Sequence, residues 1–279
     1  MIKEIVIIGK IITLLTSGTL TEQDLVQYFN ANKAILNSNI EQAVYSYKKD
    51  TLGELVSENY SRYLEDKALI LSNYERYSEA KEKAIESMNR AYGSNIPEVL
   101  IVPCIGLYAN AGWAQDVDDK HYVCLALERL PENRNIEILL AHEIGHAISE
   151  IDWSTVLDGF YNEGHATYVS SVLVPGYSDE EYLHMSREMY NSCLDWIDAN
   201  RDKIAADAGE KLEVMNEYHK FYLTTRYNVN HENIGYLIGY EYLKYLNKKY
   251  SLRELLAFDL NAAANRREFQ EFISSWVRP

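Results

Sequence analysis

The chain has 279 residues, of which 47% are apolar and 25% are charged, a composition typical of a globular protein and not of a disordered or fibrous one. Its 27 lysines and arginines stand against 42 aspartates and glutamates, a formal charge of −15, and such a surface repels phosphate backbones, which argues against nucleic-acid binding. No apolar run reaches the roughly 18 residues of a membrane span, so we expect no membrane-spanning segment.

The N-terminal segment MIKEIVIIGKIITLLTSGTL is apolar but is interrupted by Glu4 and Lys10, and no A-x-A cleavage site follows it. These interruptions argue against a secretory signal. Apolar residues recur at helical spacing from Ile5 to Leu15, so the sequence predicts an amphipathic helix that packs on the body of the protein.

The cysteines are odd in number, far apart and free of any CxxC pair, which favours buried reduced thiols over a disulfide framework. They are Cys104, Cys124 and Cys193. We therefore expect a cytoplasmic location, with export as the alternative that the apolar N-terminal segment leaves open.

From Thr21 to Asn95 the periodicity predicts helices, with Thr21 as an N-cap and the charged run ERYSEAKEKAIESMNR as a solvent-exposed helix face. We divide the chain into a helical N-terminal region, 1–95, and a catalytic region, 96–279, and expect the two to form one integrated, two-lobed unit.

After Pro97 the pattern changes to two β-branched and aromatic runs, VLIVPCIGLY and HYVCLALERL. They are separated by NAGWAQDVDDK, which contains turn-forming residues. We predict a small sheet in which the two runs form a hairpin.

The rest of the chain is predicted to be helical. A helix capped by Asn133 or Asn135 contains IEILLAHEIGHAISE and ends near Glu150, and the next runs from Ser154 through Val172. Two capping-box spacings predict further helices, Ser178 with Glu181 and Ser251 with Glu254. The predicted fold class is α+β, predominantly helical.

The most informative segment is His142-Glu143-Ile144-Gly145-His146, an HExxH sequence on a predicted helix. Residues i and i+4 lie on one helix face, so both imidazoles can bind a single cation, with Glu143 beside them to act on a bound water. The alternative is a chance match, which we expect about once in 100 sequences of this length. The segment therefore predicts metal binding by His142 and His146, with Zn²⁺ as the ion.

A hydrolytic zinc site usually has three protein ligands. Ser149 and Asp152 stand where an HExxHxxGxxH pattern needs Gly and His, which excludes the metzincin arrangement. Glu163, in FYNEGHATYVS on the next predicted helix, is the expected third ligand. Glu150 and Asp152 lie too near the first helix, and His165 lies about 200° around the helix from Glu163, as a surface or supporting histidine.

The HExxH sequence and the later segment Asn162-Glu163-Gly164-His165-Ala166 together resemble the gluzincin metallopeptidases, the thermolysin-like clan. The likeness covers about Asn133 to Tyr168. In thermolysin an Asp follows four residues after the ligand, where this chain has Thr167. HEIGHAISE, YNEGHATY and IGYLIGYEYLKYL are also similar to a bacterial family of predicted zinc-dependent proteases. The resemblance implies a zincin-like core, with a small sheet beside the HExxH helix.

The resemblance further implies peptide-bond hydrolysis, with one Zn²⁺ per chain held by His142, His146 and Glu163 and with Glu143 as general base. The expected partner is a peptide or protein substrate. Two alternatives remain open: a zinc hydrolase of a non-peptide amide or acyl substrate, and an inactive zincin-fold binding protein.

In gluzincins a downstream Tyr or His stabilises the oxyanion. Tyr236 is our first choice here, and Tyr240 and His231 are the alternatives. Tyr236 and Tyr240 share a helix face, and Gly235 and Gly239 would let that helix approach a neighbour closely. Since the chain has 23 tyrosines, a packing role is the alternative for each of them.

The resemblance also implies that a strand at the cleft rim pairs with the extended substrate. We expect HYVCLALERL to be this strand, and Ala109 to Trp113 to shape the cleft entrance before it.

Overall fold

The computed structural model describes residues 2–93, 96–130, 135–149, 156–210, 234–256, 258, 263–276 and 278. They belong to two compact units, Met1–Ile148 and Ser149–Pro279. The described part of the chain is mostly helical, with one small mixed sheet of four strands. This confirms the predicted α+β class. The expected division at residue 95 stays a prediction.

The first unit contains the sheet and the helix with the HExxH sequence. Its elements are β1 (Ile2–Glu4), α1 (Gly9–Ser17), α2 (Glu22–Ala31), α3 (Lys33–Tyr47), α4 (Leu52–Glu65), α5 (Lys67–Tyr92), β2 (Val99–Cys104), β3 (Gly112–Val117), β4 (Lys120–Ala126), the 3₁₀ turn η1 (Leu127–Arg129) and α6 (Ile136–Ile148).

Helices α2 and α4 of this unit begin at side-chain caps, and the predicted cap at Thr21 is one of them. The Thr21 hydroxyl accepts the backbone N–H of Asp24 at 3.2 Å, and the Asp24 carboxylate accepts the N–H of Thr21 at 3.3 Å, a reciprocal capping box. Thr51 and Glu54 form the same arrangement at α4. In α5 the charged run leaves an apolar stripe that is buried, from Tyr77 to Met88, as predicted for an amphipathic helix.

The N-terminal segment differs from the prediction. Residues 2–4 form β1, which pairs in parallel with β2, and the helix begins only at Gly9. Ile8, Ile11 and Leu15 are buried, so the helical periodicity holds for the second half of the segment. Pairing with a distant strand decides the conformation of the first half.

The predicted hairpin between the two apolar runs is also wrong. The strand order is β1-β2-β4-β3, and β2 and β4, which come from those runs, pair in parallel. The hairpin is formed by β3 and β4 instead. Asp118 and Asp119 connect them with φ of 49° and 60°, as a two-residue turn with two left-handed positions requires. The segment NAGWAQDVDDK therefore contains a strand.

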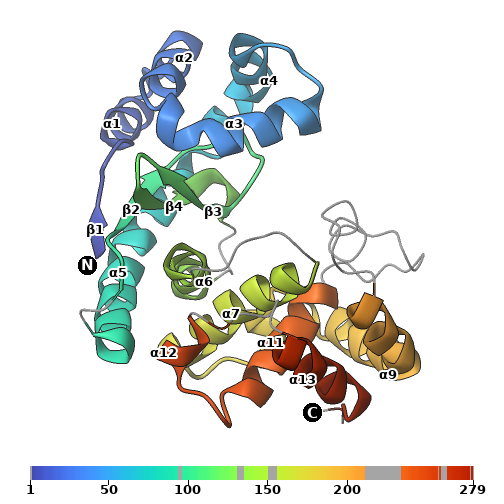
Figure 1. Ribbon diagram of the computed structural model, residues 1–279. Coiled ribbons are helices and arrows are strands. Elements are labelled where there is room, and N and C mark those ends of the chain that lie inside the picture. Colours follow the sequence, from blue (N-terminus) through green and yellow to red (C-terminus); the bar gives the residue numbers. More distant parts are fainter. Residues whose placement is uncertain are drawn as a thin grey trace. The chain divides into compact units, whose positions relative to one another are not determined.

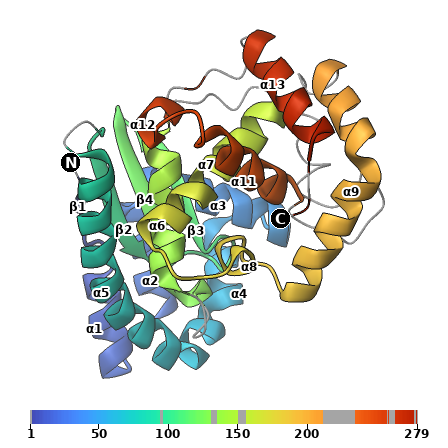
Figure 2. The ribbon, with the colours of Figure 1, turned by 90° about the horizontal axis from the view of Figure 1, so that it is seen from below.

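The sheet lies between helices. Helix α3 contacts β3 on one side, whereas α6 contacts β2, β3 and β4 on the other, with α5 beside it (Figures 1 and 2). Residues on all sides of α6 are buried, as expected for a helix enclosed by a sheet and another helix. No described helix is long and apolar enough to span a membrane.

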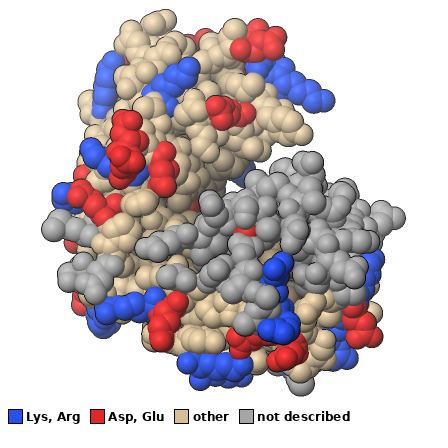
Figure 3. All heavy atoms as spheres, viewed as in Figure 1, with Lys and Arg blue, Asp and Glu red and all other residues tan. Residues whose placement is uncertain are grey.

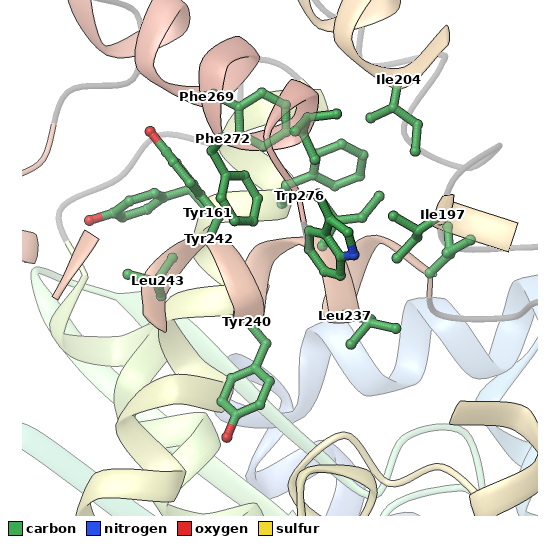
Figure 4. Close-up of a cluster of buried hydrophobic side chains, with 14 of the residues drawn as sticks. Tyr161, Ile197, Ile204, Leu237, Tyr240, Tyr242, Leu243, Phe269, Phe272 and Trp276 are labelled. Carbon is green, nitrogen blue, oxygen red and sulfur yellow. The ribbon is translucent and has the colours of Figure 1, made fainter. Parts of the chain in front are cut away.

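The second unit is helical in its described residues. Its elements are α7 (Val156–Leu173), α8 (Asp179–Tyr182), α9 (Arg187–Glu210), α11 (Ile234–Leu246), α12 (Leu252–Leu255) and α13 (Ala263–Ser274). Both predicted capping boxes are present, at Ser178 and at Ser251. The core of the unit is rich in aromatic rings, among them Tyr242, Phe269 and Phe272 (Figure 4).

All three cysteines are free and buried, as predicted. On the face drawn in Figure 3, acidic and basic side chains are interspersed. The net negative charge is therefore not gathered into one acidic patch on that face.

Candidate metal centre

The helix that carries the HExxH sequence begins at the predicted cap. The Asn135 side-chain oxygen accepts the backbone N–H of Glu137 at 3.0 Å, which satisfies one of the unpaired amides at the helix start. The alternative cap, Asn133, lies outside the described residues. The regular helix then places His142 and His146 one turn apart on the same face.

The two histidines converge through the same ring atom. Their Nε2 atoms lie 3.0 Å apart, and the rings are nearly perpendicular, at 83°. His142 is 6% exposed. Zinc–nitrogen bonds are about 2.0–2.1 Å long, so two ring nitrogens at this separation can bind one ion without a change of helix geometry.

Glu143 lies on the same helix and contacts the sheet. A Cβ added to Gly112, at the start of β3, would lie 2.8 Å from Oε1 of Glu143 and 2.9 Å from its Cγ. A side chain at this position would force the Glu143 side chain to shift. Glu143 is 7% exposed, so strand β3 forms one wall of the position that the carboxylate occupies.

Glu163 lies on α7 and is 5% exposed. Two glycines set the packing of this helix. A Cβ on Gly239 of α11 would lie 1.9 Å from the carbonyl oxygen of Phe160, and one on Gly164 would lie 2.2 Å from the carbonyl carbon of Gly239. The close approach expected of Gly239 is therefore confirmed, with Gly164 as its partner on α7, and this helix contact fixes the backbone that carries Glu163.

The structure brings together the three residues that the sequence predicts as ligands. The ligand atoms of His142, His146 and Glu163 all lie within 4.8 Å of one another. Three ligand atoms at such distances could hold one metal ion. The other acids considered, Glu150 and Asp152, lie outside the described residues.

Two residues near Glu163 are buried. His165, expected at the surface or supporting the site, is fully buried. Its ring lies parallel to that of Tyr161, with the two ring centroids 6.3 Å apart and an interplanar angle of 6°. A surface position is therefore wrong for His165, because the tyrosine-rich core covers this side of α7. Thr167, at the position where the resemblance expects an Asp, is fully buried as well.

The candidates for oxyanion stabilisation have different surroundings. Tyr236 is half-buried against the core of the second unit. Tyr240 donates its hydroxyl proton to Oδ1 of Asp179 at 2.8 Å, and Lys244 lies over its ring. Burial, followed by the nearby Asp179, raises the pKa of Tyr240. His231 lies outside the described residues.

Figure 4 shows the Tyr240 phenol directed away from the Phe269, Phe272 and Trp276 rings. Tyr240 belongs to the buried cluster of the second unit and Tyr236 packs against it; the oxyanion role of Tyr236, with Tyr240 as its alternative, stays a prediction.

The strand expected at the substrate edge is interior. HYVCLALERL contains β4, which pairs with β2 on one side and β3 on the other. The outer strand on this side is β3. In the segment Ala109 to Trp113, expected to shape the cleft entrance, residues 109–111 precede β3, and the last two residues are the first two of the strand. Their role at a cleft stays a prediction.

Comparison with protein-family models, with curated proteins and with solved structures finds no match for this chain. The gluzincin resemblance therefore rests on the motif residues of the sequence alone.

Sequence reasoning missed the contact between Gly112 and Glu143. A glycine inside a strand often marks close approach of another group, but this signal requires that the strand itself be recognised.

Proposed function

We propose that the protein is a zinc-dependent peptidase of gluzincin type with a zincin-like core, in which His142, His146 and Glu163 bind the ion. The observation that carries the proposal is the grouping of the three ligand atoms within 4.8 Å. It supports the proposal because the HExxH sequence and the NEGHA segment predict the same three residues as ligands.

The donor set suits zinc. Two imidazole nitrogens and one carboxylate are the three protein ligands of many catalytic zinc sites, which leave a further position for water. A structural zinc site is normally closed by four protein ligands, and cysteine is common among them. The three cysteines of this chain are not in the group. The side chains therefore fit a catalytic ion better than a structural one.

When bound, zinc lowers the pKa of a water molecule and polarises a carbonyl group. The protein's own part in the reaction falls mainly to Glu143. We propose that its carboxylate removes the proton from the attacking water and then delivers it to the leaving amine. Its position against Gly112 limits the directions in which the carboxylate can move, so the base is held in place before substrate binds.

A peptide substrate is supported by the edge of the sheet. Strand β3 pairs with β4 alone among the described strands, so backbone groups along its other side can pair with an extended peptide. Because Gly112 of this strand contacts Glu143, a peptide paired to β3 would lie near the general base. A non-peptide amide would not need this edge.

Metal content is the first test. Protein purified without a histidine tag is analysed by plasma mass spectrometry as wild type, His146→Ala, Glu163→Gln and Glu143→Gln, with His121→Ala as a control because His121 bonds to Asp116 at the sheet edge. We expect about one zinc per chain in the wild type, Glu143→Gln and His121→Ala, and a loss in the two ligand variants. A wild type that binds no zinc after reconstitution would overturn the proposal.

Cleavage is the second test. A peptide library is incubated with the zinc-loaded wild type, and new termini are read by mass spectrometry. We expect cleavage by the wild type and a loss of about 10²-fold or more in Glu143→Gln, which keeps its zinc. Zinc binding without any cleavage would overturn the peptidase assignment but not the metal site.

A further inference from the structure

The connection between β2 and β3 is held by side chains in an unusual way. From Ile105 to Tyr108, four successive backbone N–H groups donate to side-chain oxygens. The Ile105 N–H donates to Tyr28 of α2 at 3.3 Å, and the Leu107 N–H donates to Asn39 of α3 at 3.1 Å. The N–H groups of Gly106 and Tyr108 both donate to Glu128 of η1, at 2.9 and 3.3 Å. Tyr63 of α4 donates to the Gly106 carbonyl. Three helices and one turn thus fix a segment that has no regular structure.

The segment cannot easily take another path. A Cβ on Gly106 would lie 2.9 Å from Oδ1 of Asn39, so the glycine permits the close approach of the Asn39 amide. Tyr108 has a φ of 55°, a left-handed conformation that is uncommon for a bulky residue and persists only when its surroundings enforce it. The side-chain acceptors supply that enforcement.

Glu128 is the central acceptor. Its Oε1 atom accepts two of the four N–H groups, and the residue is 4% exposed. Its Oε2 atom is buried and has no hydrogen-bond partner among the described residues. Burial raises the pKa of Glu128 to about 7. The titratable and charged groups that face it are Tyr28, Tyr63, Cys104, Tyr108 and Arg129.

The segment leads directly to the wall beside Glu143. After Tyr108 the chain reaches Ala111, whose carbonyl accepts the N–H of Ala126 at 2.9 Å, and then Gly112, which contacts the Glu143 side chain. The position of Gly112 is therefore set from both sides: by pairing with β4, and by the fixed segment that precedes it.

We propose that Glu128 is a positioning residue: as the shared acceptor for Gly106 and Tyr108 it holds the 105–111 segment, and through it holds Gly112 against Glu143. Its effect on catalysis rests on the peptidase function proposed above, whereas its effect on the segment does not. Glu128 itself contacts neither substrate nor metal in this proposal.

The test compares hydrogen exchange of the full-length protein, read by mass spectrometry in peptides that cover 105–117. Glu128→Met removes the acceptor and keeps a similar volume, and Glu128→Gln keeps one acceptor oxygen. Asn59→Ala is the matched control, because Asn59 is also a fully buried polar residue of this unit but bonds to Leu55 within its own helix. If Glu128→Met does not fold, Glu128→Asn replaces it. The asparagine side chain is shorter by one methylene group, so its oxygen lies too far back to accept both N–H groups.

We expect exchange over 105–117 to be about tenfold faster in Glu128→Met, and close to the wild-type rate in Glu128→Gln and Asn59→Ala. Zinc content should stay the same in all variants, while kcat on a peptide cleaved by the wild type falls about tenfold in Glu128→Met, with KM changed less. Recovery of kcat in Glu128→Gln would distinguish positioning from general destabilisation.

Unchanged exchange over 105–117 in Glu128→Met would overturn the inference, and so would equally fast exchange in Glu128→Gln. If the wild type binds no zinc and cleaves no peptide, the proposed function fails. The exchange data still decide whether Glu128 holds the segment.

Discussion

Replacing Glu128 with Gln should change the pH dependence of stability, because the folded protein raises the pKa of this buried carboxyl from its ordinary value of 4.5 to about 7. Each tenfold change in the proton-dissociation constant corresponds to about 1.4 kcal/mol. The folded state therefore holds this proton more tightly than the unfolded state by about 3 kcal/mol.

The folded state binds this proton more tightly than the unfolded state, so protonation of Glu128 stabilises the fold. A carboxyl whose pKa is raised in the folded state contributes its full stabilisation below pH 4.5 and loses it as the pH rises through about 7. Between pH 4.5 and pH 8, this one group should lower the free energy of unfolding of the wild type by about 3 kcal/mol. Glu128→Gln has no proton to lose, so its stability should fall less over the same range.

The assay is urea unfolding followed by circular dichroism, for wild type and Glu128→Gln at pH 5 and pH 8. Groups that titrate in both proteins cancel in the difference between them. Glu54→Gln is a control of opposite sign, since its bonds to Thr51 lower the pKa of the exposed Glu54. A wild type and a Glu128→Gln variant with the same pH dependence would refute the reasoning.

Three other substitutions have defined outcomes. Gly112→Ala should displace the Glu143 side chain, whose Oε1 lies 2.8 Å from the added Cβ, so we expect retained zinc by mass spectrometry and kcat at least about tenfold lower; normal kcat would show that the contact is unimportant. Gly239→Ala would place a Cβ 1.9 Å from the Phe160 carbonyl oxygen, and urea unfolding should show a loss of about 3 kcal/mol or more; a loss below about 1 kcal/mol would mean that the helices separate easily. Ser251→Ala removes one acceptor of the α12 capping box, which should lower stability by about 1 kcal/mol in the same assay, and an unchanged midpoint would contradict a capping role.

The features predicted correctly from sequence depend on residues close together in the chain. The N-cap at Thr21 and the capping boxes at Ser178 and Ser251 need a side chain and an amide three residues apart. The convergence of His142 and His146 needs only a regular helix. These interactions form wherever the local backbone is helical, so sequence spacing is enough to predict them.

The errors concern partners that are distant in the chain. Residues 2–4 are a strand because β2, almost a hundred residues later, offers an edge. The segment NAGWAQDVDDK does not read as a strand because β3, which it contains, is only partly buried and lacks a strong apolar alternation. Hydrogen bonds between strands depend on residues far apart in the chain, so a local sequence pattern does not predict them.

The same distinction applies to the candidate site. The sequence by itself determined the class of fold and the helix that carries His142, Glu143 and His146, and it predicts Glu163 as the third ligand. Only the tertiary structure decided that Gly112 forms a wall beside Glu143 and that Glu128 holds the segment leading to it. These contacts join residues brought together by sheet pairing and helix packing, and their energies depend on burial, which no spacing in the sequence specifies.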